Sequence, residues 1–163
     1  MPVMNKPALH QLIVAALEQD LAIAQRAAQT AYETATHEEN IAENKYDTLG
    51  LEASYLATGQ ARRMAEIAHA LKRLRELPVL NHQPVRGIQP GDYIELETPE
   101  GQTRALFLGP DAAGLVVTAQ GRAVTVITPH APLGRALVGK QAGEDISVAV
   151  AGKAQDYYIA LVC

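Results

Sequence analysis

Two long segments in the first half of the chain carry apolar side chains at the spacing of a coiled-coil seam. In the first segment the steps alternate between three and four residues, through Val14, Leu17, Leu21, Ala24, Ala28, Ala31 and Ala35. In the second segment they run through Leu49, Ala53, Leu56, Gln60, Arg63, Ile67, Ala70, Leu74 and Leu77. This spacing is typical of helices that pack along one shared face. We therefore predict an antiparallel helical hairpin, an arm roughly 50 Å long at the rise of an α-helix.

Capping residues indicate where these helices begin and end. Asn5 is a good N-cap, and Pro7 two residues later is favoured in the first turn of a helix. Asn44, followed three residues later by Asp47, resembles a capping box and would start the second helix at the next residue. Pro78 should stop that helix.

The second half of the chain has a different composition. Ten of the twelve glycines and most of the prolines lie from Pro78 onward, which places a linker at residues 76–87. We predict two domains, 1–78 and 79–163. Short runs of alternating polarity separated by turn residues predict six strands, at 92–98, 103–109, 114–120, 122–128, 145–150 and 155–162.

One short helix is expected between the fourth and fifth strands. The segment "PLGRALVGK" (132–140) begins with Pro132, which favours a helix start, and contains Gly139, which favours a helix end. The expected fold class is α+β, with a helical hairpin followed by an antiparallel β domain that carries one short helix.

Charge is sorted along the predicted arm. Residues 33–52 hold six acidic residues and one basic residue, whereas residues 62–75 hold five basic residues and one acidic residue. Solubility alone favours a mixture of signs, although a coiled coil with solvated flanks would tolerate this pattern. The hairpin is therefore expected to be acidic at its tip and basic towards its root.

Composition excludes several classes of protein. A net charge of -4 gives no general attraction to nucleic acid or to anionic membranes. Cys163 is the single cysteine, so no internal disulfide is expected. No segment resembles a signal peptide or a membrane span, and we expect a soluble, cytoplasmic protein. The five histidines are scattered without metal-ligand spacing, and no nucleotide-binding glycine motif is present.

The segment from Ile127 to Val162 resembles the carboxy-terminal domain of the bacterial Gre family of transcript cleavage factors. That family has a Ser-Pro followed by a short helix with a central arginine and then Gly-Lys. Here the matching residues are Pro132, Arg135, Leu137, Gly139 and Lys140, and Ala131 replaces the serine. The resemblance implies that the β domain is similar to FK506-binding proteins, and with the hairpin it covers nearly the whole chain.

The resemblance also implies a function. Gre factors dock on the rim of the secondary channel of RNA polymerase and insert the hairpin, whose tip carboxylates help to hold a magnesium ion at the polymerase active site. Backtracked RNA is then hydrolysed by the polymerase itself. The chain is thus expected to be no enzyme on its own and to act as a monomer. It would bind no cofactor tightly and no membrane, share Mg²⁺ with the polymerase, and meet the transcript 3′ end indirectly.

The tip carries the residues that the resemblance assigns to cleavage. In the family pattern an aspartate is followed by two other residues and then by a Glu-Asn pair. In "NIAENKYD" Glu43 aligns with the family glutamate and is the expected magnesium ligand, while Asn40 stands where the aspartate belongs. Glu39 and Asp47 are the nearest other acidic residues. Magnesium sites commonly use one or two protein carboxylates with phosphates and water, so the tip need not bind the ion alone.

Two further groups of residues are candidate contacts of the polymerase. The resemblance places a polymerase-facing patch at Thr128, His130, Pro132, Leu133 and Arg135. At Leu133 two readings stay open, an exposed docking residue or a core residue. The pair Arg62 and Arg63 would contact RNA or polymerase, or would belong to a solvated helix face.

Three functions compete. The first is a regulator in the polymerase secondary channel, either a factor that stimulates cleavage or a modulator that only occupies the channel. The second is a prolyl isomerase, by analogy with the fold of the β domain. However, that half has only Tyr93, Phe107, Tyr157 and Tyr158 to build an aromatic pocket. The third is a coiled-coil adaptor unrelated to transcription, which would leave the charge sorting and the "PLGRALVGK" match unexplained.

Overall fold

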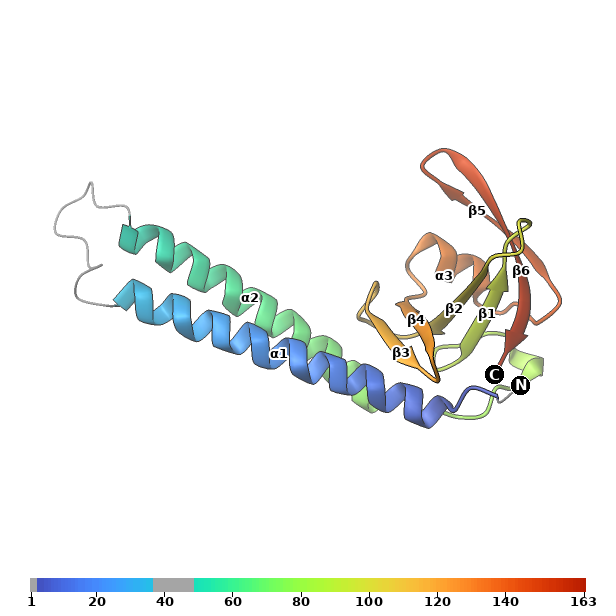
Figure 1. Ribbon diagram of the computed structural model, residues 1–163, viewed down its shortest axis with the longest axis horizontal. Coiled ribbons are helices and arrows are strands. Elements are labelled where there is room, and N and C mark those ends of the chain that lie inside the picture. The colour runs from blue at the N-terminus through green and yellow to red at the C-terminus, as the bar shows by residue number, and fades with distance from the viewer. Residues whose placement is uncertain (1–2, 37–48) are drawn as a thin grey trace. The chain divides into compact units, whose positions relative to one another are not determined.

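The structure is a computed structural model that describes the backbone of residues 3–36 and 49–163 and the side chains of residues 3–34 and 58–163. Two long helices, α1 (Lys6–Thr36) and α2 (Leu49–Glu76), are followed by a 3-10 turn, η2 (Pro84–Arg86). The β domain then contains the strands β1 (Tyr93–Glu97), β2 (Thr103–Leu108), β3 (Val116–Ala119), β4 (Arg122–Ile127), β5 (Asp145–Val150) and β6 (Lys153–Val162), with α3 (Pro132–Leu137) between β4 and β5. The predicted order of elements is confirmed (Figure 1).

The chain divides into two compact units. One contains Ala15–Lys72, the larger part of the helical hairpin, and the other contains the residues up to Val14 together with Arg73–Cys163. The first turns of α1 and the last turn of α2 thus pack with the β strands. The domain boundary expected at residue 78 stays a prediction.

The two long helices lie side by side in opposite directions (Figure 1). The hydrogen bond between His10 Nε2 and the Leu74 carbonyl oxygen, at 2.6 Å, joins the beginning of α1 to the end of α2. The predicted seam of α1 is confirmed, because each of its described positions is buried or half-buried: Val14, Leu17, Leu21, Ala24, Ala28 and Ala31.

The seam of α2 differs from the prediction at one position. Gln60, Ile67 and Ala70 are buried or half-buried as expected, but Arg63 is exposed and Met64 is half-buried in its place. A buried guanidinium without an acidic partner would lose its hydration at a large cost in free energy, whereas a flexible thioether fills a narrow seam readily. The correction follows from side-chain chemistry, because periodicity alone allows either residue.

Both described helix ends agree with their capping signals. Asn5 Oδ1 accepts a hydrogen bond from the Ala8 N–H at 3.0 Å, and α1 begins at the next residue, Lys6. At its other end α2 finishes at Glu76, two residues before Pro78. The expected capping box at residues 44–47 lies outside the described residues.

The six strands form one sheet in the order β3-β4-β2-β1-β6-β5. The prediction of an antiparallel sheet is wrong for one pair, because β2 and β4 run parallel. The chain leaves β2, forms β3 at the edge, and returns through Gln120 and Gly121, both at positive φ, to insert β4 between β3 and β2. Positive φ at both turn residues is the geometry of a tight two-residue hairpin, which fixes the direction of β4.

The main core of the β domain lies between α3 and the sheet. It is built from residues of all the strands but β3, together with one residue of α3 and one that precedes β1, and comprises Ile88, Ile94, Leu96, Leu106, Leu108, Ile127, Leu137, Ile146, Val148, Tyr157 and Ile159. The opposite face of the sheet also buries large side chains, including Tyr93, Phe107 and Val126. Leu74 lies against this face, since a Cβ at Gly109 would meet both Leu74 and Val126 within 4 Å.

A buried polar cluster fixes the beginning of α1 to the β domain. Lys6 Nζ lies 3.3 Å from Asp92 Oδ1 and also donates to the Leu80 carbonyl oxygen. The second carboxylate oxygen of Asp92 pairs with His82 Nδ1 at 2.8 Å and accepts from the Gln89 N–H at 2.9 Å. A second tie joins the Asn5 N–H to Gln120 Oε1 at 2.8 Å.

Candidate functional site

The predicted catalytic tip falls in the part of the chain that the structure does not describe. Glu39, Asn40, Glu43 and Asp47 all lie between the last residue of α1, Thr36, and the first residue of α2, Leu49. Their roles, including that of Glu43 as a magnesium ligand, stay predictions. Among the described residues, no group of three or more His, Cys, Asp or Glu side chains is arranged to hold a metal ion.

The predicted basic segment of the hairpin lies on α2. Arg62 and Arg63 are both exposed, so both guanidinium groups are open to a partner or to solvent. Farther along the same helix, Arg73 pairs with Asp111 of the β domain at 3.6 Å. Helix α2 therefore presents two adjacent exposed arginines, although the seam pattern had placed Arg63 inside, and their contact with RNA or polymerase stays a prediction.

The head of α3 is held tightly against the end of β4. The N-cap residue Ala131 is extended, with φ -71° and ψ 152°, and its side chain makes no capping hydrogen bond. The first helical residue is Pro132. Gly134 lies directly on the backbone of Thr128, because a Cβ at Gly134 would be 1.8 Å from the Thr128 carbonyl oxygen. The helix ends at Leu137, and Gly139, at φ +81°, reverses the chain after it. This close packing explains why position 134 of "PLGRALVGK" is a glycine, because any side chain there would overlap the Thr128 backbone.

The predicted docking residues are only partly exposed. His130, Pro132 and Arg135 are exposed, and Arg135 Nε donates to the His130 carbonyl oxygen at 2.9 Å. Thr128 is half-buried. Leu133 is half-buried as well and packs against the main core, as the core interpretation expects, and its docking role stays a prediction.

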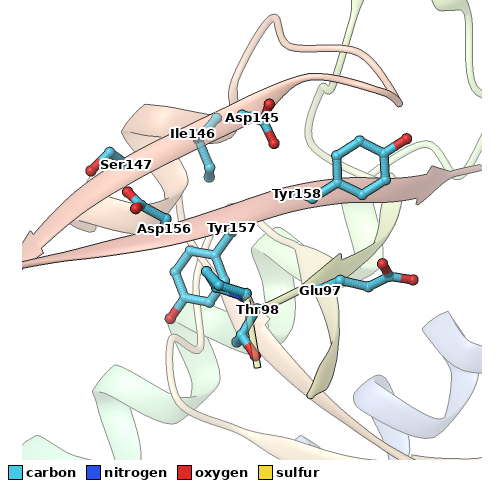
Figure 2. A pocket seen from close by; sticks show the side chains of 9 residues that line it. Glu97, Thr98, Asp145, Ile146, Ser147, Asp156, Tyr157 and Tyr158 are labelled. Carbon is cyan, nitrogen blue, oxygen red and sulfur yellow. The ribbon is translucent and has the colours of Figure 1, made fainter. Parts of the chain in front are cut away.

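A second surface feature, which the sequence did not single out, is a pocket of about 530 Å³ beside β5 and β6. The strand register aligns Glu97 of β1 with Tyr158 of β6, and Tyr158 with Asp145 of β5. Asp156 lies two residues before Tyr158 in β6, on the same face of the strand (Figure 2). The carboxylates of Glu97, Asp145 and Asp156 therefore make this part of the β domain acidic. Alternation along each strand could have indicated which side chains share a face of the sheet. Only the pairing register shows that these three carboxylates, from three strands, lie in the same region.

The two tyrosines of this region have different environments. Tyr157 and Tyr158 point to opposite sides of β6 (Figure 2), as expected for neighbours in a strand. Tyr157 is buried, its hydroxyl accepts from Arg104 at 3.0 Å, and the Arg104 guanidinium lies 5.8 Å from its ring centre. Tyr158 is 42% exposed. One of these two tyrosines is therefore a core residue and the other is open to solvent.

Two groups near the root of the hairpin have shifted proton affinities. Burial raises the pKa of the Cys163 thiol, and the negative charges of Asp92 and Glu95 act in the same direction against Lys6. Burial also raises the pKa of Tyr93, whose hydroxyl donates to Glu95 Oε1 at 2.8 Å. Arg122 pairs with the same Glu95 carboxylate. Both shifts favour the neutral forms of these groups near pH 7.

No protein-family model and no curated protein sequence matches the chain. Among solved structures, GreA factor homolog 1 (Gfh1) of Thermus thermophilus is 20% identical over 92% of this chain and 94% of its own, with a TM-score of 0.40. Gfh1 of Thermus aquaticus is 21% identical over 91% and 92%, with a TM-score of 0.38. The elongation factor GreA/GreB of Nitrosomonas europaea is 22% identical over 64% and 78%, with a TM-score of 0.37.

These three solved structures are, by name, two Gfh1 proteins and one GreA/GreB elongation factor. With identities under 25% and TM-scores under 0.5, this likeness carries no argument about what the chain binds or does. None of the described helices is long and apolar enough to cross a membrane.

Proposed function

We propose that this chain is a transcription elongation regulator that binds RNA polymerase at the rim of the secondary channel and places its hairpin tip near the active site. The observation that carries the proposal is the sorting of charge on a two-helix hairpin. Residues 33–52 hold six acidic residues and one basic residue. Acidic residues are what a magnesium-containing centre attracts, and the β domain that follows carries the "PLGRALVGK" segment on the surface helix α3.

The described part of the hairpin supports this use. A thin seam built from Ala24, Ala28 and Ala31 on α1 lets the two helices approach closely, which keeps the hairpin narrow. A narrow rod is required to enter a channel. At the base of the rod, Lys6 and Asp92 pair inside the β-domain unit, so the first turn of the hairpin has a firm attachment.

The β domain would provide the docking surface. His130, Pro132 and Arg135 are exposed on and before α3, and the backbone contact of Gly134 with Thr128 holds that surface in one conformation. An ordered surface loses little conformational freedom when a partner binds, so it binds more tightly than a flexible one of equal area.

At the tip the chemistry would be supplied by the polymerase. Glu43 would offer one carboxylate to the magnesium ion, and Asn40 would offer an uncharged oxygen in the place of the family aspartate. Bound Mg²⁺ activates water for attack on a phosphate and stabilises the charge that develops there. The chain's own contribution is to position a ligand oxygen, and a tip that lacks the family aspartate would leave a modulator that occupies the channel without stimulating cleavage.

The isomerase alternative has less support in the fold. The space between α3 and the sheet is filled by Leu96, Leu137 and Ile159, each with 0% of its surface exposed. A proline-binding cleft at that place would need an open, apolar floor.

The experiment that tests the proposal is a transcript cleavage assay on halted, backtracked elongation complexes, with and without the purified chain. Stimulated release of short 3′ fragments is expected. If cleavage is unchanged but the chain competes with a secondary-channel ligand, the protein is the non-cleaving modulator. Neither cleavage nor competition at saturating protein would refute both forms of the proposal.

A further inference from the structure

The most exposed large apolar side chains of the described residues gather in one place. Val85 is 95% exposed, Val3 is 68% exposed and Leu80 is 65% exposed, and every other large apolar side chain described is less exposed than these. Val3 and Leu80 line one groove of about 420 Å³, whose wall also includes Pro84, the neighbour of Val85. Single exposed apolar residues are common on proteins, but a cluster around a groove marks an interaction site.

All parts of this surface belong to the same compact unit. The residues before α1, the segment between α2 and β1, and the end of β6 meet at the groove, close to η2 (Figure 1). We call Val3, Leu80, Pro84 and Val85 the linker surface. Residues 76–87 were expected to be a linker between two domains. That role does not explain why Leu80 and Val85 carry exposed aliphatic side chains.

The turn that carries Val85 is rigid. The N–H groups of Arg86 and Gly87 donate to the carbonyl oxygens of Gln83 and Pro84 at 3.0 and 3.1 Å, and Gln141 Nε2 donates to the Pro84 carbonyl oxygen at 2.8 Å. Gly87 packs on the backbone of Gly139, where a Cβ would come within 2.3 Å of the carbonyl oxygen. A valine held outward by a fixed backbone is a preorganised anchor for a partner.

The charges beside the linker surface are positive. Arg86 follows Val85 directly, and Lys140 is held beside the turn by the hydrogen bond from the Ile88 N–H to its carbonyl oxygen at 2.8 Å. Both side chains are exposed, and neither has an acidic partner among the described residues. Two polar side chains that line the groove itself, those of Lys6 and His82, are already paired with Asp92.

Besides the paired Asp92, a second acidic residue lies in the neighbourhood. Glu144 accepts a hydrogen bond from the Gln141 N–H at 2.6 Å, which places its carboxylate at the turn after α3. Glu144 does not pair with Arg86, so the net charge of the exposed side chains Arg86, Lys140 and Glu144 is positive. The partner that complements this surface thus has an apolar side chain for the groove and carboxylates beside it.

We propose that the linker surface is a second docking site for RNA polymerase, in which an apolar side chain of the polymerase enters the groove and flanking Asp or Glu residues pair with Arg86 and Lys140. This inference rests on the proposed function and extends the contact from α3 to η2 and the start of α1. A protein partner fits the surface better than RNA does, because most of the groove lining is aliphatic and its aromatic ring, that of His82, is largely buried and held by Asp92, so it is not open for base stacking.

The test is a binding titration of labelled full-length chain with core RNA polymerase. Val85→Asp and Leu80→Asp should each weaken binding at least tenfold, because each places a charge where an apolar group must be buried. Arg86→Glu should weaken binding less and should reduce its dependence on salt, because it removes an ion pair. Val150→Asp is the matched control, since Val150 is 56% exposed but lies at the far end of β5.

Thermal melting of each variant separates lost binding from lost folding, and Val85→Asp should melt like the unchanged chain because its side chain contacts almost nothing. If Val85→Asp and Leu80→Asp are folded and bind as tightly as Val150→Asp does, the linker surface is not a docking site, while the proposed function stands. If the unchanged chain does not bind polymerase, both proposals are wrong. Polymerase-independent binding of RNA that needs Arg86 would overturn the choice of a protein partner.

Discussion

Lys6 in the first turn of α1 and Asp92 just before β1 form an ion pair between residues 86 positions apart in the chain, and both side chains are buried. The pair fixes the beginning of the hairpin to the sheet. Asp92 is fully used, because it also binds His82 and the Gln89 N–H, so the cluster leaves no carboxylate oxygen without a partner.

Removing Asp92 should destabilise the protein strongly. In Asp92→Ala, Lys6 would remain buried without its counter-charge, and breaking a buried pair from one side typically costs about 3 to 5 kcal/mol. Urea unfolding followed by circular dichroism measures the change. Lys6→Met, which removes the other charge and keeps the apolar stem, should partly rescue Asp92→Ala in the double variant.

The matched control is the pair of Arg73 and Asp111, whose side chains are 44% and 33% exposed. Arg73→Ala should change the free energy of unfolding by no more than about 0.5 kcal/mol, because exposed ion pairs contribute little. Equal effects of Asp92→Ala and Arg73→Ala would contradict the assigned role of burial.

Two glycine-to-alanine substitutions should have opposite effects. A Cβ at Gly134 would overlap the Thr128 backbone at 1.8 Å, and since neither backbone can move freely, Gly134→Ala should cost at least about 2 kcal/mol. Gly59, inside α2, has no atom within 4 Å of an added Cβ, so Gly59→Ala should stabilise the helix by about 1 kcal/mol. Melting temperatures of the two variants should move in opposite directions.

The sequence predicted the elements well because periodicity and capping are local. Asn5 does cap α1, and the six strands were found within a few residues of their observed bounds. The parallel pairing of β2 with β4 was missed, because it depends on where β3 lies, and that is a property of the sheet and not of any one strand.

The candidate site was predicted less completely. Leu133 carries an apolar side chain next to an exposed proline, and sequence alone could not tell a docking residue from one that packs on the core. The linker surface was missed because Leu80 and Val85 lie in a segment rich in turn residues, where no periodicity indicates which side chains are exposed. Val3 joins them only through the tertiary fold.

Substitutions in the α3 patch should separate binding from stability. Leu133→Asp is expected to lower the melting temperature, because its side chain packs against the main core. Arg135→Glu should leave the melting temperature nearly unchanged, since Arg135 is exposed, and should weaken polymerase binding in a pull-down. A loss of binding in Leu133→Asp alone, without any effect in Arg135→Glu, would remove the docking role from this patch.

The single cysteine should react slowly. Because burial raises the pKa of Cys163, a smaller fraction of its thiol is ionised near neutral pH than in an unfolded chain, where the pKa is about 8.5. The thiolate is the nucleophile, so alkylation by iodoacetamide should be slower in the folded protein than in urea. The alkylation rate should also reach its half-maximal value at a higher pH in the folded protein than in urea. Identical pH profiles in both states would contradict the assigned environment.

The tip offers the sharpest test of function, because substitutions there should leave folding and docking intact. If Glu43 supplies a ligand oxygen to the magnesium ion at the polymerase active site, Glu43→Ala should retain polymerase binding and lose most of the cleavage stimulation of the unchanged chain. Asn40→Asp, which restores the acidic residue of the family pattern, should raise cleavage because a second charged oxygen binds Mg²⁺ more strongly than an amide oxygen does.

Glu66→Ala, on α2 in the basic segment, is the control for loss of an exposed acid away from the tip. All four proteins are compared at saturating concentration on the same backtracked complexes. If Asn40→Asp gains cleavage that the unchanged chain lacks, then Asn40 is what makes this chain a channel modulator, and the rest of the hairpin is competent for cleavage. Equal cleavage by the unchanged chain, Glu43→Ala and Asn40→Asp would show instead that the tip takes no part in the chemistry.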